Sequence, residues 1–320
     1  MYWCHVPDLL GGWVPAIHAN CVHNEVAALL LRTLGPTPVD PGSPFLKDEY
    51  ATLRKLARKL GVARWTRERV VSSYAGRMRL RYQRALNSLN VEGGLDRSDA
   101  HISAFLKGEK FNPLLKLSKP RMIMARKPRF NLELASYLKP FEHAFWKRLK
   151  GTCAGVTPTR VVGKGLNGHQ RARLIARKME EIGEDCVVFE VDGKSFEAHV
   201  TYEDLQREHS VYRAGFKGDQ ALSWMLDCQL TLKGHTACGV KYRRDGARAS
   251  GDYNTGLGNT IIMLTVCRAA MRHLRDVKSL RFRWDLLADG DNCLIFVEGR
   301  KASQVHSMLH LRCRLLARKS

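Results

Sequence analysis

Two aspartates that follow strand-like runs are the residues best suited to hold a divalent cation. Asp192 ends the apolar, β-branched run CVVFEVD, and Asp291 lies in the Ala288-Asp289-Gly290-Asp291 turn of a predicted hairpin. Carboxylate oxygens suit Mg²⁺, which shares its coordination with substrate phosphates, and Mn²⁺ is the alternative ion. Two ions held there would activate a 3′-hydroxyl and stabilise a leaving pyrophosphate. Either Asp could instead serve as a turn residue or helix cap, so only a fold that joins them makes this site.

Between the two aspartates lies SGDYNTGLGNT, residues 250–260, which follows a predicted hairpin and opens a helix. Its glycines permit close backbone approach, and its small polar side chains supply hydrogen-bond donors and acceptors. The segment is either a capped helix start or a surface for sugar hydroxyls and the backbone of a template, and its density of polar residues favours the second interpretation.

Upstream, residues 119–131 read KPRMIMARKPRFN and alternate basic with apolar residues. We expect an extended basic ribbon that neutralises a triphosphate or RNA phosphates, although a charged edge strand would look similar. Lys107 and Lys110 in FLKGEK lie in a similar setting. A predicted helix over 67–89 carries an outer basic face that is either solvated or turned to nucleic acid; its residues are Arg77, Arg79, Arg81 and Arg84.

Composition supports a polyanionic partner. The 320 residues include 53 Lys+Arg against 31 Asp+Glu, a net charge of +22, spread along the chain. A large positive charge favours nucleic acid, or less often an anionic membrane surface. The 44% apolar content excludes wholesale disorder. No apolar run reaches the ~18 residues of a membrane span, and the start lacks the pattern of a secretory signal.

The elements that must position these residues are mixed. Helices are expected near 24–35, 47–60, 67–89, 169–182, 202–214 and 218–231, with another from about 254. Hairpins are expected over 236–250, with Asp245-Gly246 as the tight turn, and over 280–299.

The order of these segments resembles that of motifs F, A, B and C of viral RNA-dependent RNA polymerases. The segments are the basic ribbon, the strand that ends in Asp192, the loop and helix start rich in Gly, Ser, Thr and Asn, and the hairpin with the Gly-Asp turn. The closest resemblance is to the tombusvirus-like group, most specifically in SGDYNTGLGN and PRMIMARKPRFNLELASYLKPFE. The segments VHNEVAALLLRTL, YAGRMRLRYQRAL and HISAFLKGEK resemble the fingers of that group, so the similarity spans about 22–298.

The resemblance implies an α+β fold with right-hand polymerase fingers and palm, an antiparallel palm sheet flanked by helices, and a truncated thumb. It divides the chain into an N-terminal fingers region (1–118), basic ribbon and fingers/palm helices (119–185), palm (186–300) and a short C-terminal segment (301–320).

The resemblance also implies roles for individual residues. Asp192 and Asp291 would hold the catalytic metals, with Asn292 beside them, and Glu197 would sense the ribose. The ribose and the template would be positioned by Ser250, Thr255 and Asn259. Nucleotide phosphates would be held by Arg121, Arg126 and Arg129. RNA would be bound by Lys107, Lys110, Lys127 and Gly251.

Some positions depart from the pattern of the group. Asn292 replaces the usual second Asp of motif C, which removes one negative charge and should weaken Mg²⁺ binding. Lys194 replaces the usual Ser of motif A, and Glu197 replaces Asp.

The resemblance implies RNA template, nascent RNA and ribonucleoside triphosphates as partners, with another viral chain supplying the thumb or a membrane anchor. It implies a location in the host cytoplasm at membrane-associated replication complexes. Two alternatives stay open: a reverse transcriptase, although the Tyr-x-Asp-Asp turn is absent, and a catalytically silent RNA-binding protein derived from a polymerase.

Overall fold

The computed structural model describes residues 2–3, 15–37, 42–115, 117–151, 156–193 and 195–316, and side chains within these ranges from 15 to 308. The first half contains β1 (Tyr2–Trp3), β2 (Ala16–Ile17), α1 (Val22–Ala28), the π-helix η1 (Leu29–Thr33), α2 (Pro44–Arg58), α3 (Arg67–Ser72), α4 (Gly76–Val91), β3 (Ile102–Leu106), β4 (Met122–Ala125) and α5 (Pro128–Arg148). The second half contains α6 (Gly168–Ile182), β5 (Cys186–Asp192), α7 (Phe196–His199), α8 (Tyr202–Gly215), α9 (Gln220–Asp227), β6 (Thr231–Thr236), β7 (Lys241–Asp245), α10 (Thr255–Asp276), β8 (Trp284–Asp289), β9 (Asn292–Glu298) and α11 (Gly299–Leu316).

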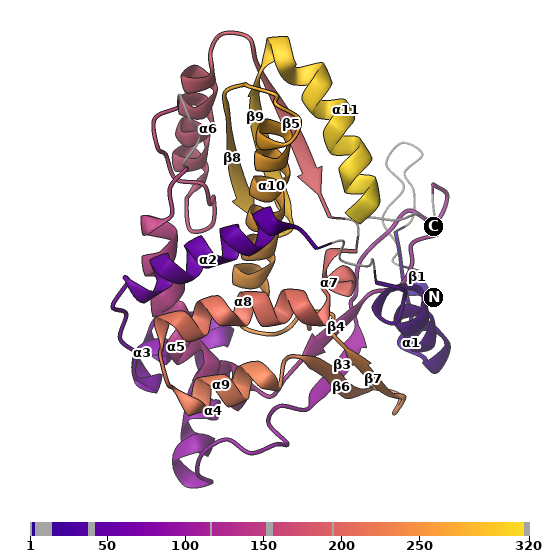
Figure 1. The fold of residues 1–320 in the computed structure, drawn as a ribbon. Coiled ribbons are helices and arrows are strands. Elements are labelled where there is room, and N and C mark those ends of the chain that lie inside the picture. The colour runs from indigo at the N-terminus through magenta and orange to yellow at the C-terminus, as the bar shows by residue number, and fades with distance from the viewer. Residues whose placement is uncertain are drawn as a thin grey trace.

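One sheet has three antiparallel strands in the order β5-β9-β8, and we call it the palm sheet after the prediction from the resemblance. Its strands are apolar on both faces, because helices cover both sides (Figure 1). Cys293, Ile295 and Val297 of β9 pack into the main core with α10, whereas Leu294 and Phe296 pack with residues of α6 on the other face. This arrangement confirms the predicted antiparallel sheet flanked by helices.

A second sheet of four strands, in the order β4-β3-β6-β7, lies away from the palm sheet (Figure 1). Its centre joins β3 to β6 in parallel, although these strands are far apart in the chain. Gly234 allows the close approach, because a Cβ at that position would overlap the carbonyl oxygen of Ile102. The helices α2, α5 and α8 pack together around a core that includes Tyr50, Phe141 and Tyr212 and that continues to Ile295 of β9.

Several predicted elements are confirmed, and others need correction. The helix expected over 67–89 is two helices, because Ala75 is extended and Gly76 has φ +55°. The turn of the β6–β7 hairpin lies between Thr236 and Lys241, not at Asp245-Gly246.

The helix expected over 218–231 ends at Asp227, which leaves residues from 231 free to form β6. The basic ribbon is extended only through β4, since α5 begins at Pro128. The boundaries proposed between fingers, palm and C-terminal segment stay predictions.

Candidate active site

The palm sheet brings Asp192 and Asp291 to the same end. Asp192 ends β5 and lies opposite Asn292, the first residue of β9, in the antiparallel register. The amide of Gly193 donates a hydrogen bond to the carbonyl oxygen of Asp291 at 3.3 Å. The backbones that carry the two predicted acids are therefore neighbours at one end of the sheet.

The turn that carries Asp291 is held in place by α10. Gly290 adopts φ +68°, a conformation that favours glycine. Its amide donates to Thr260 Oγ1 at 2.9 Å, and Thr260 Oγ1 donates to the carbonyl oxygen of Gly256 at 2.7 Å. The loop-helix predicted as motif B and the turn predicted as motif C are thus in direct contact.

The acidic end of the sheet is open to solvent. Asp192 and Asn292 are exposed, and Asp291 is half-buried. Two carboxylates and an amide oxygen are the hard donors that Mg²⁺ or Mn²⁺ accepts, and exposure leaves room for water and substrate oxygens to complete the coordination. These residues fit such an ion. Within the described ranges, this end of the sheet included, no three or more His, Cys, Asp and Glu side chains gather into a metal site. Lys194 lies outside the described residues.

The motif B loop is packed closely against β4. Gly251 donates from its amide to the carbonyl oxygen of Met124 at 2.8 Å, and a Cβ at position 251 would overlap that oxygen. Ser250 Oγ accepts from the Met124 amide at 3.1 Å. Gly251 is therefore a residue of close backbone packing here, and the RNA contact predicted for it stays a prediction.

Two other polar residues were predicted at this loop, Thr255 and Asn259, and both are at least partly buried. Thr255 is half-buried, and its hydroxyl donates to the carbonyl oxygen of Ala249 at 2.8 Å. Asn259 is buried, and its Oδ1 atom has no hydrogen-bond partner among the described residues. Their contacts with ribose and template stay predictions.

A buried ionic network supports this loop from below. Arg126 is fully buried and pairs with Asp252, and its guanidinium also donates to the carbonyl oxygens of Ala100 and Cys228. Gln229 links Asp252 to Asn254 through its amide nitrogen, at 2.9 and 2.7 Å. The network continues from Asn254 to Glu208, which pairs with buried Arg248.

Arg126 therefore does not hold a phosphate in this arrangement, contrary to the sequence prediction. Its guanidinium is paired with the Asp252 carboxylate in the interior, where burying an unpaired guanidinium would destabilise the folded chain.

Arg129 is also placed differently from the prediction. It lies in the first turn of α5, is largely buried and pairs with Asp99 at 3.2 Å. Its guanidinium also donates to the carbonyl oxygens of Gly93 and Gly94, so it joins α5 to the end of α4. Lys127 is half-exposed and donates to Ser98 Oγ, and Lys110 is exposed.

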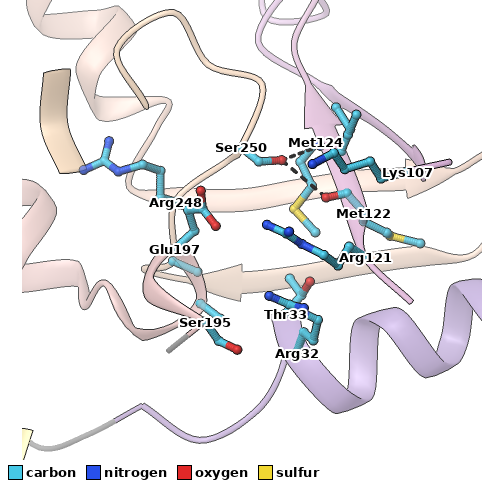
Figure 2. A pocket seen from close by; sticks show the side chains of 13 residues that line it. Arg32, Thr33, Lys107, Arg121, Met122, Met124, Ser195, Glu197, Arg248 and Ser250 are labelled. Carbon is cyan, nitrogen blue, oxygen red and sulfur yellow. Dashed lines mark hydrogen bonds between the residues drawn. The ribbon is translucent and has the colours of Figure 1, made fainter. Parts of the chain in front are cut away.

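Arg121 and Lys107 differ from Arg126 because they face a pocket of about 260 Å³ (Figure 2). Residues predicted from a fingers segment and from motifs F, A and B line it together: Lys107, Arg121, Glu197 and Ser250. Figure 2 shows the Arg121 guanidinium and the Glu197 carboxylate pointing toward each other across the space.

Glu109 bridges the two cations, since its Oε1 lies 2.5 Å from Lys107 Nζ and 3.0 Å from Arg121 Nη1. Although burial opposes it, the hydrogen bond from Lys107 and the nearby cations leave the pKa of Glu109 lowered.

The pocket also contains residues that the sequence did not single out, namely Arg32, Thr33, Ser195 and Arg248. Arg32 comes from the π-helix, and burial followed by the charge of Arg121 lowers its pKa. Two like charges near one cavity indicate a site for an anion. The segment of Arg32, VHNEVAALLLRTL, resembles the fingers of the family, but nothing in it distinguishes Arg32 as a pocket residue, because only the fold brings Arg32 to the pocket.

The structure thus combines an antiparallel sheet that has Asp192 and Asp291 at one end with a cationic pocket lined by Lys107, Arg121 and Arg32. The chain belongs to the viral RNA-dependent RNA polymerase family, which it matches over residues 10–314. This match confirms the resemblance found in its motifs.

Relatives within the family are RNA-directed RNA polymerases of plant viruses. The chain is 34% identical to that of turnip crinkle virus over 248 residues, covering 76% of the chain and 30% of the relative. It is 33% identical to that of tomato bushy stunt virus (strain Cherry) over 306 residues, covering 92% and 36%. The chain therefore spans about a third of the length of these relatives.

Proposed function

We propose that this chain carries the nucleotidyl-transfer site of a viral RNA-directed RNA polymerase. The single observation behind the proposal is the hydrogen bond from the Gly193 amide to the Asp291 carbonyl oxygen, which joins the two predicted acids. A polymerase needs such a pair beside a site for a triphosphate, and Arg121, Lys107 and Arg32 surround a pocket of suitable charge.

In this proposal the pocket receives the incoming ribonucleoside triphosphate. Arg121 and Lys107 bind phosphate oxygens after exchanging their contact with Glu109, and Arg32 adds a third cation. Glu197 and Ser250, which also line the pocket, meet the ribose. A 2′-hydroxyl donates to a carboxylate and accepts from a hydroxyl, so this pair of residues would favour ribonucleotides.

Asp192 and Asp291, with Asn292 as a neutral oxygen donor, would hold Mg²⁺ or Mn²⁺ in this proposal. When bound, such ions lower the pKa of the attacking 3′-hydroxyl and offset charge on the phosphates. The contribution of the chain is to hold exposed Asp192 and half-buried Asp291 at a rigid sheet end, fixed by the contact between Gly290 and Thr260.

RNA template and nascent RNA are the proposed macromolecular partners. Arg77, Arg79, Arg81 and Arg84 of α4 are exposed, and three of them line a groove of about 570 Å³ with Lys127 and Arg129. Such a groove suits a phosphate backbone.

Among the described helices, none has the length and apolar content to cross a bilayer. We keep as proposals the host-cytoplasmic, membrane-associated location and the other viral chain that would provide an anchor or thumb.

Primer extension on an RNA template tests the proposal. We expect Asp192→Ala to reduce synthesis by about 10³-fold or more, since metal ligation is worth several kcal/mol. Binding of RNA, measured by fluorescence anisotropy, should be retained because Asp192 is exposed and supports no packing. Full synthesis by the variant would remove Asp192 from the site. RNA binding by the unaltered chain without any synthesis would favour the catalytically silent RNA-binding protein instead.

A further inference from the structure

Lys164 lies beside the motif C turn, and neither the motifs nor the pocket account for it. Residues 161–163 run along the free edge of β8: the amide of Ala288 donates to the carbonyl oxygen of Val161, and the amide of Gly163 donates to that of Ala288, both at 2.9 Å. The palm sheet thus has Lys164 at its β8 edge and Glu197, which follows β5, near its opposite edge.

The Lys164 ammonium group rests against Gly256 near the start of α10, because a Cβ added at Gly256 would overlap Nζ. One turn further along α10, Thr260 accepts the hydrogen bond of Gly290. Contacts from two sides, through Gly163 and Gly256, therefore place Lys164 next to the turn that carries Asp291.

The segment around Lys164 is held rigidly and is strongly positive. Arg160 donates to the carbonyl oxygens of Val162 and Lys164, which fixes the turn. Arg171 pairs with Asp289 at 2.6 Å, so the nearby carboxylate is already neutralised. The half-buried Lys164 ammonium has no hydrogen bond or ion pair to any described residue.

We propose that Lys164 binds a backbone phosphate of the RNA strand whose 3′-hydroxyl is extended. The inference rests on the proposed function, in which two phosphate-bearing substrates meet at Asp192 and Asp291. The triphosphate pocket lies toward the β5 edge, which leaves the β8 edge and its unpaired cation for the other substrate. Lys164 is thus a positioning residue for the growing strand.

The variants that test this are Lys164→Ala, Lys164→Arg and Gly256→Ala. The last keeps the charge but displaces it, and costs little in folding because alanine favours a helix over glycine. Lys217→Ala is the matched control, since Lys217 is exposed on the loop between α8 and α9.

Fluorescence anisotropy compares the binding of two RNAs, a hairpin with a recessed 3′ end and a single-stranded template. The KM for nucleotide is measured as well. We expect Lys164→Ala to weaken hairpin binding about tenfold and to reduce the salt dependence by about one phosphate contact. Gly256→Ala should weaken it in the same direction, Lys164→Arg should restore binding, and Lys217→Ala should change nothing.

Unchanged hairpin binding in both Lys164→Ala and Gly256→Ala would overturn the inference and leave the proposed function standing. So would a raised KM for nucleotide with unchanged hairpin binding, which would assign Lys164 to the triphosphate. Failure of the unaltered chain to bind either RNA would overturn the proposed function and this inference together.

Discussion

The two halves of the candidate site differ in the burial of their polar and charged side chains, which are exposed in one half and buried in ion pairs in the other. At the palm end, Asp192 and Asn292 are exposed, and the backbone pairing of β5 with β9 places them. Behind the motif B loop, the charged side chains are buried in two ion pairs, Arg126 with Asp252 and Arg248 with Glu208. Charged residues of a motif are available to a substrate only where the fold leaves them exposed or lining a pocket; where the fold buries them in ion pairs, they stabilise the loop instead.

The strongest test of this contrast removes a buried charge. Arg126→Ala should lower the free energy of unfolding by about 3–5 kcal/mol, because Asp252 would be left as an uncompensated buried carboxylate. Urea denaturation measures this. The double variant Arg126→Met/Asp252→Leu should recover most of the stability. Lys127→Ala, on the neighbouring half-exposed side chain, should cost less than about 1 kcal/mol. Equal losses at 126 and 127 would contradict the contrast.

Arg121, only five positions before Arg126, should behave as a substrate ligand. Arg121→Ala should raise the KM for ribonucleotides about tenfold with little change in stability, since a charge-assisted contact to phosphate is lost. Steady-state primer extension separates KM from kcat. Glu109→Gln serves as the control, because it breaks the same ion pair but keeps the cation. If both variants raise the KM equally, Arg121 only holds Glu109 in place.

At the end of the palm sheet, Asn292 leads to a prediction about which metal ion supports synthesis better. With one carboxylate fewer than the usual motif C, we expect more synthesis with Mn²⁺ than with Mg²⁺. Asn292→Asp should shift the preference toward Mg²⁺, as titrations of each ion in primer extension would reveal. Equal or better synthesis by the unaltered chain with Mg²⁺ would count against this role of Asn292.

The smallest effect concerns His209, which is fully buried on α8 beside the ionic network. Burial, and then the charges of Arg248 and other arginines, hold its pKa well below the ordinary 6.5. The unfolded chain therefore takes up a proton below pH 6.5 that the folded chain excludes, so stability falls as the pH drops. The slope from one such group reaches at most about 1.4 kcal/mol per pH unit. Urea denaturation at pH 7.5, 6.5 and 5.5 measures it, and His209→Gln should reduce the slope by one proton. An unchanged slope would show that other groups titrate.

Much of the site was predictable because its signals are local. The hairpin of Trp284–Asp289 and Asn292–Glu298 is apolar on both strands around a Gly-Asp turn, and Cys186–Asp192 is a β-branched run of strand length. Antiparallel neighbours in one sheet then bring Asp192 and Asp291 together. The amino-acid order of SGDYNTGLGN carried the family resemblance, and the match over residues 10–314 confirms it.

The tertiary structure determines which charged residues face a pocket and which are buried in ion pairs. Arg121, Arg126 and Arg129 lie within nine residues of one basic segment, yet one faces the pocket, one is buried against Asp252 and one joins α5 to α4. Arg32 lines the pocket and Lys164 contacts Gly256, although neither residue stands out in its own segment. The physical reason is that side-chain type and spacing specify local conformation, whereas burial and ion pairing depend on partners contributed by distant parts of the chain.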